Sequence, residues 1–326
     1  MLDRRTLLKG AMAAPLLHAC GSPPTPWPRG AYRKPDRSRV AIVPAREYGP
    51  RLADVLRNGL ALFDLPVNGK TIVLKPNFVE YDATGVINTH PSVIAAAIDA
   101  FRRLGARRVT VAEGPGHARD VEHIITASGL HDVLREYRAG YVDLNYDDTR
   151  RLALRSRYTS LGSLHLPETI LDADLVVSMP KLKTHHWAGV TLSMKNFFGV
   201  VPGAVYGWPK NALHWAGIHE SVVDINSTLP VKTFAIIDGV IGMEGNGPIQ
   251  GEPKPCGVLV LSDDLVAADA TAARVMSIDP GRVRYIEEGG RFLGNMAAER
   301  IVQMADSIET HRTTFRLLPP FARLRA

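Results

Sequence analysis

The stretch Ala173–Met179, with the sequence ADLVVSM, is an apolar run typical of a buried strand, and Pro180–His186, with the sequence PKLKTHH, follows it directly. A second polar stretch, Thr191–Gly199 with the sequence TLSMKNFFG, comes shortly afterwards. Open α/β sheets bind ligands at the carboxyl ends of their strands. The combination of an apolar strand and a dense group of cationic and hydrogen-bonding residues therefore predicts a site at the end of this strand.

Strands and helices alternate on both sides of this stretch. Apolar runs predict strands over residues 40–43, 71–74, 108–112, 174–179, 234–237 and 257–261. Amphipathic patterns and end signals predict helices over 50–63, 91–104, 120–128, 213–229 and 263–276. This order indicates an α/β domain over residues 39–300, with a doubly wound, mainly parallel sheet and helices on both faces. Residues 143–166 lack a clear period and are expected to form an irregular insertion.

The N-terminal residues predict an export signal. Residues 1–20 carry paired arginines, a modest apolar run and the box Leu17-His18-Ala19-Cys20. The pattern favours the twin-arginine route, with a simple Sec signal as the alternative, and it makes Cys20 the expected lipidation site. We therefore expect the periplasmic side of the cell envelope, either lipid-anchored or soluble. Residues 21–38 are rich in Pro, Gly and Ser and are expected to be a flexible tether.

The distribution of charge argues against nucleic acid as a partner. The chain has 326 residues and a net charge of +6, but the basic excess lies near its two ends, and residues 40–310 are net acidic. An acidic body with basic ends suits a membrane surface better than DNA. Residues 301–326 are expected to form a basic amphipathic tail that lies on lipid or packs on the body.

The cysteine count limits the cofactors. Cys20 belongs to the predicted signal, which leaves Cys256 alone. Four-cysteine ligation of an iron–sulfur cluster is therefore excluded for this chain. Cys256 is expected to be a small structural residue.

Polar residues follow several predicted strands, and parallel strands bring such residues to one edge. We expect this edge to hold an anion, because lysine binds phosphate and carboxylate groups as a point charge. The alternative for each lysine is an ordinary surface position. The candidate ligand-binding residues are Lys75, Asn77, Asn88, Glu113, Lys181, Lys183, Thr191, Asn196, Asp238, Gly245 and Gly247.

Three residues are candidates for catalysis. His185 or Glu244 would move a proton, and Lys195 would stabilise developing negative charge. A divalent metal is a further hypothesis, with His185, His214 and Asp238 as ligands, although no HExxH pattern is present. A hard cation held by carboxylates and a substrate phosphate is the alternative.

Several motifs together resemble the domain of unknown function 362 (DUF362) family. They are KPN at 75–77, NTHP at 88–91, PKLKTH at 180–185, TLSMKNFFG at 191–199, DG at 238–239 and EGNGP at 244–248. The resemblance covers most of residues 40–290. It implies one shared pocket but assigns no catalytic roles. Some members carry an added iron–sulfur module, whose cysteines this chain lacks, and others are similar exported twin-arginine proteins.

Two functions are consistent with these patterns. The first is a membrane-anchored α/β enzyme that acts on an anionic small molecule, with or without a bound metal. The alternative is a non-catalytic periplasmic protein that binds an anionic ligand or a metal complex. A carboxylate or histidine close to the lysines favours the enzyme, whereas a pocket lined by lysine alone favours the binding protein.

Overall fold

The computed structural model describes residues 25–83, 86–116 and 120–325, and one mixed sheet organises them. Its principal strand order is β12-β1-β11-β10-β7-β2-β3-β4, and β8 and β9 extend it beside β10. The strands are β1 (Ser38–Pro44), β2 (Thr71–Pro76), β3 (Arg108–Glu113), β4 (Gly140–Asp143), β7 (Leu175–Met179), β8 (Lys181–His185), β9 (Gly189–Thr191), β10 (Lys232–Asn246), β11 (Gln250–Ser262) and β12 (Ile301–Ala305). Only the β1–β11, β10–β11 and β8–β9 pairs of this sheet are antiparallel among the described residues. The predicted mainly parallel α/β sheet is confirmed.

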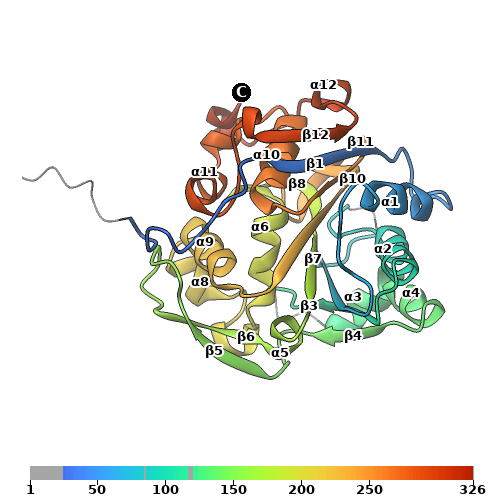
Figure 1. Cartoon of the computed structure of the whole chain (residues 1–326), viewed down its shortest axis with the longest axis horizontal. Coiled ribbons are helices and arrows are strands. Elements are labelled where there is room, and N and C mark those ends of the chain that lie inside the picture. The colour runs from blue at the N-terminus through green and yellow to red at the C-terminus, as the bar shows by residue number, and fades with distance from the viewer. Residues whose placement is uncertain (1–24, 84–85, 117–119, 326) are drawn as a thin grey trace, which may run out of the picture.

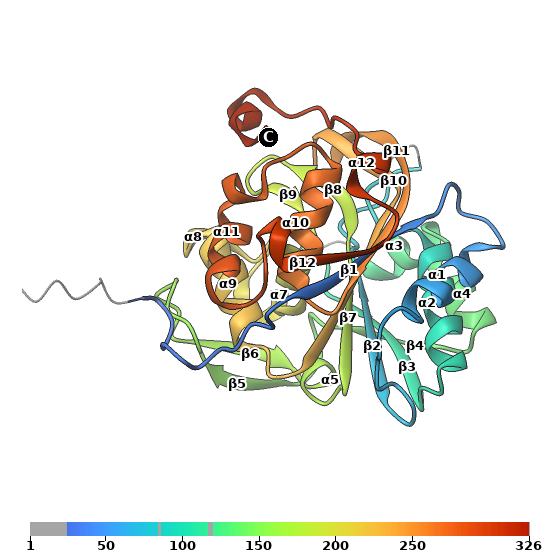
Figure 2. The ribbon, with the colours of Figure 1, turned by 45° about the horizontal axis from the view of Figure 1, so that its top comes forward.

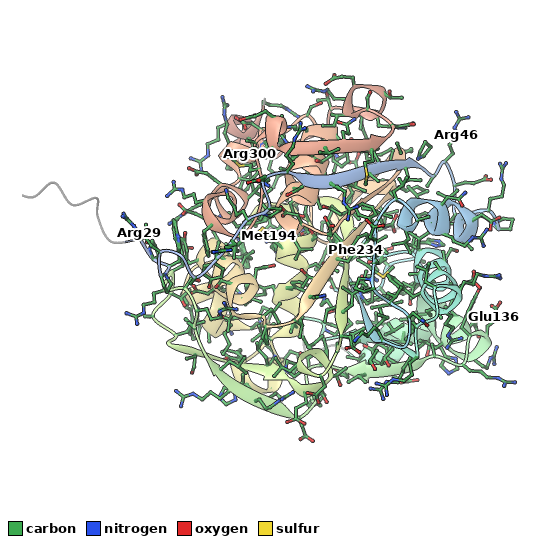
Figure 3. All side chains as sticks on the ribbon, in the orientation of Figure 1. Arg29, Arg46, Glu136, Met194, Phe234 and Arg300 are labelled. Atoms are coloured by element: carbon green, nitrogen blue, oxygen red, sulfur yellow. The ribbon has the colours of Figure 1, made fainter. Side chains whose placement is uncertain are left out.

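Helices cover both faces of the sheet, as Figure 1 shows. One face packs against α1 (Leu52–Leu60), α2 (Pro91–Arg103), α3 (Val121–Ala127) and α4 (Leu130–Glu136). The other packs against α6 (Ser193–Asn196), α9 (Ile218–Thr228), α10 (Leu265–Val275) and α11 (Arg284–Phe292). The alternation of strand side chains produces two cores, since Ile72 and Leu74 point into one and Val73 into the other. Met194 and Phe234 belong to different cores, whereas Arg46 and Glu136 project outward (Figure 3).

The middle of the sheet sets the position of the site. Strand β7 pairs in parallel with β2 on one side and with β10 on the other. Because β2, β3 and β7 run in the same direction, their carboxyl ends lie at one edge of the sheet. The chain turns at Pro180 and continues as β8, which pairs with β10 and then with β9. The polar stretch after β7 is therefore a further strand rather than a loop.

Two internal segments differ from the sequence prediction. The expected irregular insertion contains a two-stranded antiparallel sheet of β5 (Thr149–Ala153) and β6 (Ser163–Pro167), followed by the short α5 (Glu168–Leu171). The helix expected over 213–229 is divided into α8 (Asn211–Trp215) and α9. The break falls at Gly217, whose φ of 104° does not fit a helix. The remaining short elements are α7 (Gly203–Tyr206), α12 (Ile308–His311), and the 3₁₀ turns η1 (Phe197–Val200), η2 (Pro280–Arg282), η3 (Ala298–Arg300) and η4 (Pro319–Leu324).

The predicted signal over residues 1–20 and its Cys20 lie outside the described residues. The part of the predicted tether that the structure describes begins at residue 25, and within it Trp27 and Tyr32 lie against the body while most of residues 28–37 are exposed. Trp27 stacks on Phe292 at 4.5 Å between ring centroids, and Tyr32 meets the same ring edge-on. These two aromatic side chains give the segment apolar surface to pack against the body. Its high Pro and Gly content did not predict this packing.

The C-terminal residues pack on the body, which was one of the two expected alternatives. Strand β12 extends the sheet beside β1, so the domain does not end at residue 300. Phe315 is fully buried and Leu324 nearly so, and both belong to the core that contains α10. Figure 2 shows this segment beside the ends of β10 and β11. Within the described residues, no helix has the length and apolar character needed to cross a membrane.

Candidate functional site

A cavity of about 380 Å³ opens at the carboxyl edge of the sheet. Its wall is formed by the segments after β2 and β3, by β8, β9, α6 and η1, and by the tip of the β10–β11 hairpin. The predicted residues that line it are Lys75, Asn77, Glu113, Lys183, His185, Thr191, Lys195, Asn196 and His214. Those that do not line it are Asn88, Lys181, Asp238, Glu244, Gly245 and Gly247.

Asp269 of α10 fixes the motif that carries Lys195 and Asn196. Its carboxylate accepts hydrogen bonds from the backbone N–H groups of Ser193 at 2.7 Å and Met194 at 3.0 Å. These are orphan donors at the start of the short helix α6, and a buried carboxylate satisfies them. Burial raises the pKa of Asp269 to about 7, although the hydrogen bonds from Ser193 and Met194 oppose this rise. Helix α10, which packs on the same face of the sheet as α6, thus fixes the backbone at the start of the motif.

The floor of the cavity is a buried ion pair between Lys75 and Glu113, with the Lys75 Nζ and Glu113 Oε1 atoms 2.5 Å apart. Asn196 Oδ1 accepts a second hydrogen bond from Lys75, and the other Glu113 oxygen accepts the Phe78 N–H at 2.9 Å. Burial lowers the pKa of Lys75, and the charge of Glu113 opposes this effect. A Cβ at Gly199 would lie 2.5 Å from the Lys75 ammonium, so only glycine fits beside the pair. Lys75 is therefore neutralised within the protein.

Lys183 and Lys195 differ from Lys75 because no carboxylate of the described residues pairs with either. Lys183 is fully buried and donates to the carbonyl oxygens of Ile87 at 2.7 Å and Pro248 at 3.2 Å. Lys195 Nζ lies 5.7 Å from the ring centroid of Phe198. Burial, reinforced by the charge of Lys75, lowers the pKa of Lys195 to about 7. Burial and the charge of Lys195 also hold the pKa of Lys183 well below its usual range.

Lys210 is a cavity residue that the sequence analysis missed. It is fully buried, and its Nζ donates to the carbonyl oxygens of Gly114 at 2.8 Å, Gly199 at 3.0 Å and Phe198 at 3.3 Å. These bonds join the end of β3 to η1, and burial lowers the pKa of Lys210 to about 7. Nothing in the sequence around it marks this role. Trp187 and Phe198 were also missed, although Trp187 directly follows the 180–186 motif and Phe198 lies inside the 191–199 motif.

The tautomer of His185 is set by its neighbours. Its Nδ1 accepts the backbone N–H groups of Trp187 at 3.0 Å and Ala188 at 3.3 Å, so the ring proton must be on Nε2. Burial and the charge of Lys195 hold its pKa well below the usual range. In this tautomer Nε2 offers a neutral N–H donor, which disfavours the predicted roles of proton acceptor and metal ligand. A metal-bound histidine instead donates its second ring N–H to a neighbour.

Two polar atoms in the cavity wall are buried without a hydrogen-bond partner: Asn77 Oδ1 and Thr191 Oγ1. Both residues are more than nine-tenths buried. Thr191 lies opposite Lys183 in the β8–β9 register. Buried polar atoms without partners are uncommon in proteins and cost about 1–3 kcal/mol each. Their place in the cavity wall, with Thr191 opposite Lys183, indicates a site built to receive a ligand with donor groups or bridging water.

Lys181 and Asp238 form a separate buried cluster outside the cavity. Lys181 Nζ lies 2.6 Å from Asp238 Oδ2, and the Tyr48 hydroxyl donates to the other carboxylate oxygen at 2.9 Å. The backbone N–H of His90 also donates to Asp238 at 3.0 Å. Both charges are satisfied internally, which disfavours the ligand-binding roles predicted for Lys181 and Asp238 and the metal-binding role predicted for Asp238. Lys181 fits the structural alternative.

The remaining predicted residues also have structural roles. Glu244 pairs with Lys254 at 3.5 Å and accepts the backbone N–H of Arg316, which removes it as the expected general base. Asn88 spans the 79–80 backbone with hydrogen bonds to Val79 N–H and Glu80 carbonyl. Gly245 and Gly247 make close backbone approaches to Arg316 and Thr184 rather than cradle an anion. In the described part of the chain, no group of three or more His, Cys, Asp or Glu residues is placed to hold a metal.

The fold and the cavity define an α/β protein with a cationic pocket at the carboxyl edge of its sheet. Residues 72–274 match the profile of the domain of unknown function family DUF362, and the chain belongs to this family. A thylakoid-associated protein of Synechocystis sp. is 29% identical over 227 residues, which cover 66% of this chain and 65% of that protein. The match therefore spans a little under two thirds of that relative.

Two solved structures share a remote likeness. The lactate racemase apoprotein from Thermoanaerobacterium thermosaccharolyticum has a TM-score of 0.47 and 14% identity, and the match covers 76% of this chain and 59% of that one. A Thermotoga maritima protein has a TM-score of 0.37 and 13% identity, with coverage of 68% and 57%. Similarity at this level carries no information about what this chain binds.

If the Lys181–Asp238 pair is structural, loss of Lys181 should lower the stability of the protein without changing its affinity for an anion. Replacing Lys181 with Met strands a buried carboxylate and should lower the free energy of unfolding by about 3–5 kcal/mol. The binding of sulfate should not change, because Lys181 does not line the cavity. Urea unfolding and sulfate titration measure the two quantities.

Lys70→Met is the matched control, since Lys70 pairs with Asp174 while 46% exposed and its loss should cost less than about 1 kcal/mol. A Lys181→Met protein as stable as this control, or one with weakened sulfate binding, would contradict the structural role.

Proposed function

We propose that this protein is an enzyme that binds an anionic small molecule in the cavity and transfers a proton to or from it. One observation carries the proposal. The same cavity is lined by two lysines without a carboxylate partner among the described residues, Lys183 and Lys195, and by two buried oxygen atoms without a hydrogen-bond partner, Asn77 Oδ1 and Thr191 Oγ1. An anion would neutralise the two ammonium groups. Its hydroxyl or bridging water would satisfy the two buried oxygens.

The chemistry follows from the protonation states. With a pKa near 7 in the empty protein, Lys195 is largely a neutral amine above neutral pH. A bound anion raises this pKa, so Lys195 accepts a proton from an acidic C–H or O–H group in the fraction of complexes in which it is still the amine. His185 Nε2–H and the Nζ–H groups of Lys183 are donors that would stabilise the negative charge left on the substrate. Glu113 cannot serve as the base, because both of its oxygens already accept hydrogen bonds. The site thus has a base, Lys195, and two hydrogen-bond donors, His185 and Lys183, that would stabilise negative charge on the substrate.

The alternative, a binding protein without turnover, rests on a different observation. Lys183 and Lys210 donate to backbone carbonyl oxygens, and the Lys75–Glu113 pair is closed. Because these side chains already form hydrogen bonds within the protein, they can hold an anion in place without exchanging a proton with it. The base role of Lys195 is therefore the point at which the two functions differ.

Hydrogen exchange on a small carboxylate with an acidic C–H group tests the proposal. We use pyruvate and 2-oxobutyrate in D₂O, where proton removal from C3 moves an electron pair into a C2=C3 bond and leaves an enolate oxygen. Lys195 would then return deuterium to C3 after exchange with solvent. Wild-type protein should catalyse C3 exchange measured by ¹H NMR, with kcat/KM rising with pH around a midpoint near 7 as Lys195 loses its proton.

Lys195→Arg keeps the positive charge but cannot act as a base near neutral pH, so exchange should fall at least 100-fold while pyruvate binding remains. Lys70→Arg is the control and should exchange at the wild-type rate. Binding of both acids by wild-type protein without any exchange would support the binding protein, and absence of binding would sink the anion site itself.

We also propose that the protein is exported and anchored by lipid at Cys20, on the periplasmic side of the envelope. The support is the paired arginines and the Leu17–Cys20 box, and the relative from Synechocystis sp. is named as thylakoid-associated. A soluble periplasmic form is the alternative.

Replacing Cys20 with Ala removes the acylated thiol, so the protein should leave the membrane fraction or retain an uncleaved N-terminus. Fractionation and intact mass measure both outcomes, with Cys256→Ala as the control that should stay in the membrane fraction. A Cys20→Ala protein that is cleaved normally and still fractionates with membranes would contradict lipidation.

A further inference from the structure

The cavity is lined by two chemically different groups of side chains. Its lining includes the cationic and hydroxyl side chains Lys183, Lys195 and Thr191 and the aromatic side chains Trp187, Phe198 and His214, and the two groups meet where Lys195 Nζ lies over the Phe198 ring. The Trp187 and His214 rings meet edge-to-face at 5.2 Å between centroids, and Phe198 meets His214 in the same way at 4.9 Å. The three rings therefore form a continuous aromatic wall, named here the Trp187 wall.

The backbone around this wall is fixed. The Trp187 N–H donates to His185 Nδ1, which holds the turn between β8 and β9. His186 and His214 each place their Nδ1 atom beside a backbone carbonyl, that of Gly247 at 2.8 Å and that of Lys210 at 3.1 Å. A carbonyl oxygen can only accept, so both rings donate from Nδ1 and their orientation is set.

Trp187 is 56% exposed, whereas His185 and Ala188 beside it in the chain are buried. By contrast, Trp27 on the other side of the molecule is covered by Phe292 at 4.5 Å. A large aromatic surface that lies at a cavity and is left open is typical of a ligand contact, because it gains free energy when another ring covers it. Trp215 is 83% exposed and does not line the cavity, so it is not part of this wall.

We infer that the occupant of the cavity carries a flat ring next to its anionic group, with the ring against the Trp187 wall and the anion on Lys195. The inference rests on the proposed function and adds the class of substrate to it. Lys195 Nζ lies 5.7 Å from the Phe198 ring centroid, so one short linker between ring and anion reaches both. A cavity of about 380 Å³ has room for one ring and its substituents.

Three carboxylates of equal charge test this inference: acetate, cyclohexylacetate and phenylacetate, each titrated by calorimetry and by tryptophan fluorescence. Phenylacetate should bind at least tenfold more tightly than acetate and several-fold more tightly than cyclohexylacetate, because only the flat ring can stack on the wall. In Trp187→Ala the preference for phenylacetate over acetate should fall at least fivefold, with acetate affinity unchanged.

Trp215→Ala is the matched control and should keep the wild-type preference. Thermal melts of both variants show that folding is retained, since each side chain is more than half exposed. Acetate binding with no gain for phenylacetate, or a preference that survives in Trp187→Ala, would overturn the ring inference and leave the anion site standing. Failure of acetate, phenylacetate and sulfate alike to bind would instead overturn the proposed function.

Discussion

The burial of lysine ammonium groups at one edge of the sheet is the constraint on which the site depends. Taking a charge out of water is costly unless a partner compensates it. Lys75 has Glu113 as its partner, whereas Lys183 and Lys195 have none among the described residues. The protein tolerates this cost because hydrogen bonds elsewhere in the fold fix the backbone that carries these lysines. Asp269, for example, accepts the backbone N–H groups at the start of α6, the helix that carries Lys195.

This constraint makes stability depend on pH in a defined direction. The pKa of Lys195 is about 7 in the folded protein and near its ordinary value, above 10, in the unfolded chain. Between these pH values the unfolded chain binds more protons, so the free energy of unfolding rises with pH. Below pH 7 the charged form predominates in both states, and the cost of its burial is fully present. A bound anion should remove that cost by favouring the charged form.

Much of the fold could be predicted because its strands are short apolar runs and its helices carry clear end signals. Strands β2, β3 and β7 lie where hydrophobic pattern places them. The β5–β6 pair was not predicted, since β5 is half-buried or exposed throughout and β6 offers only Leu164 and Leu166 as alternating apolar residues, which is too short a pattern to identify a strand. The docking of Trp27 and Phe315 depends on partners distant in sequence, which local composition does not identify.

Only part of the candidate site was predicted, because strand ends can be located from the sequence whereas strand pairing cannot. Their positions at strand ends predicted that Lys75, Lys183 and Glu113 would lie together, and all three line the cavity. Lys181 and Lys183 are two residues apart on β8, a spacing that ordinarily puts both on one face. The register of β8 against β10 shifts between them, from Asp238 to Met243, and so one lysine meets Asp238 while the other reaches the cavity. A register shift of this kind depends on pairing and has no signature in the sequence.

The most direct test of the central claim is the pKa of Lys195, measured by NMR of its side-chain Nζ and Cε nuclei with Lys195→Met to assign the signal. Sulfate is the probe, because its charge is constant from pH 6 to 10. The account predicts a pKa of about 7 in the empty protein and a clear rise when sulfate binds, with uptake of a proton at pH 8. A pKa above 10 in the empty protein, or one that sulfate does not move, would contradict it.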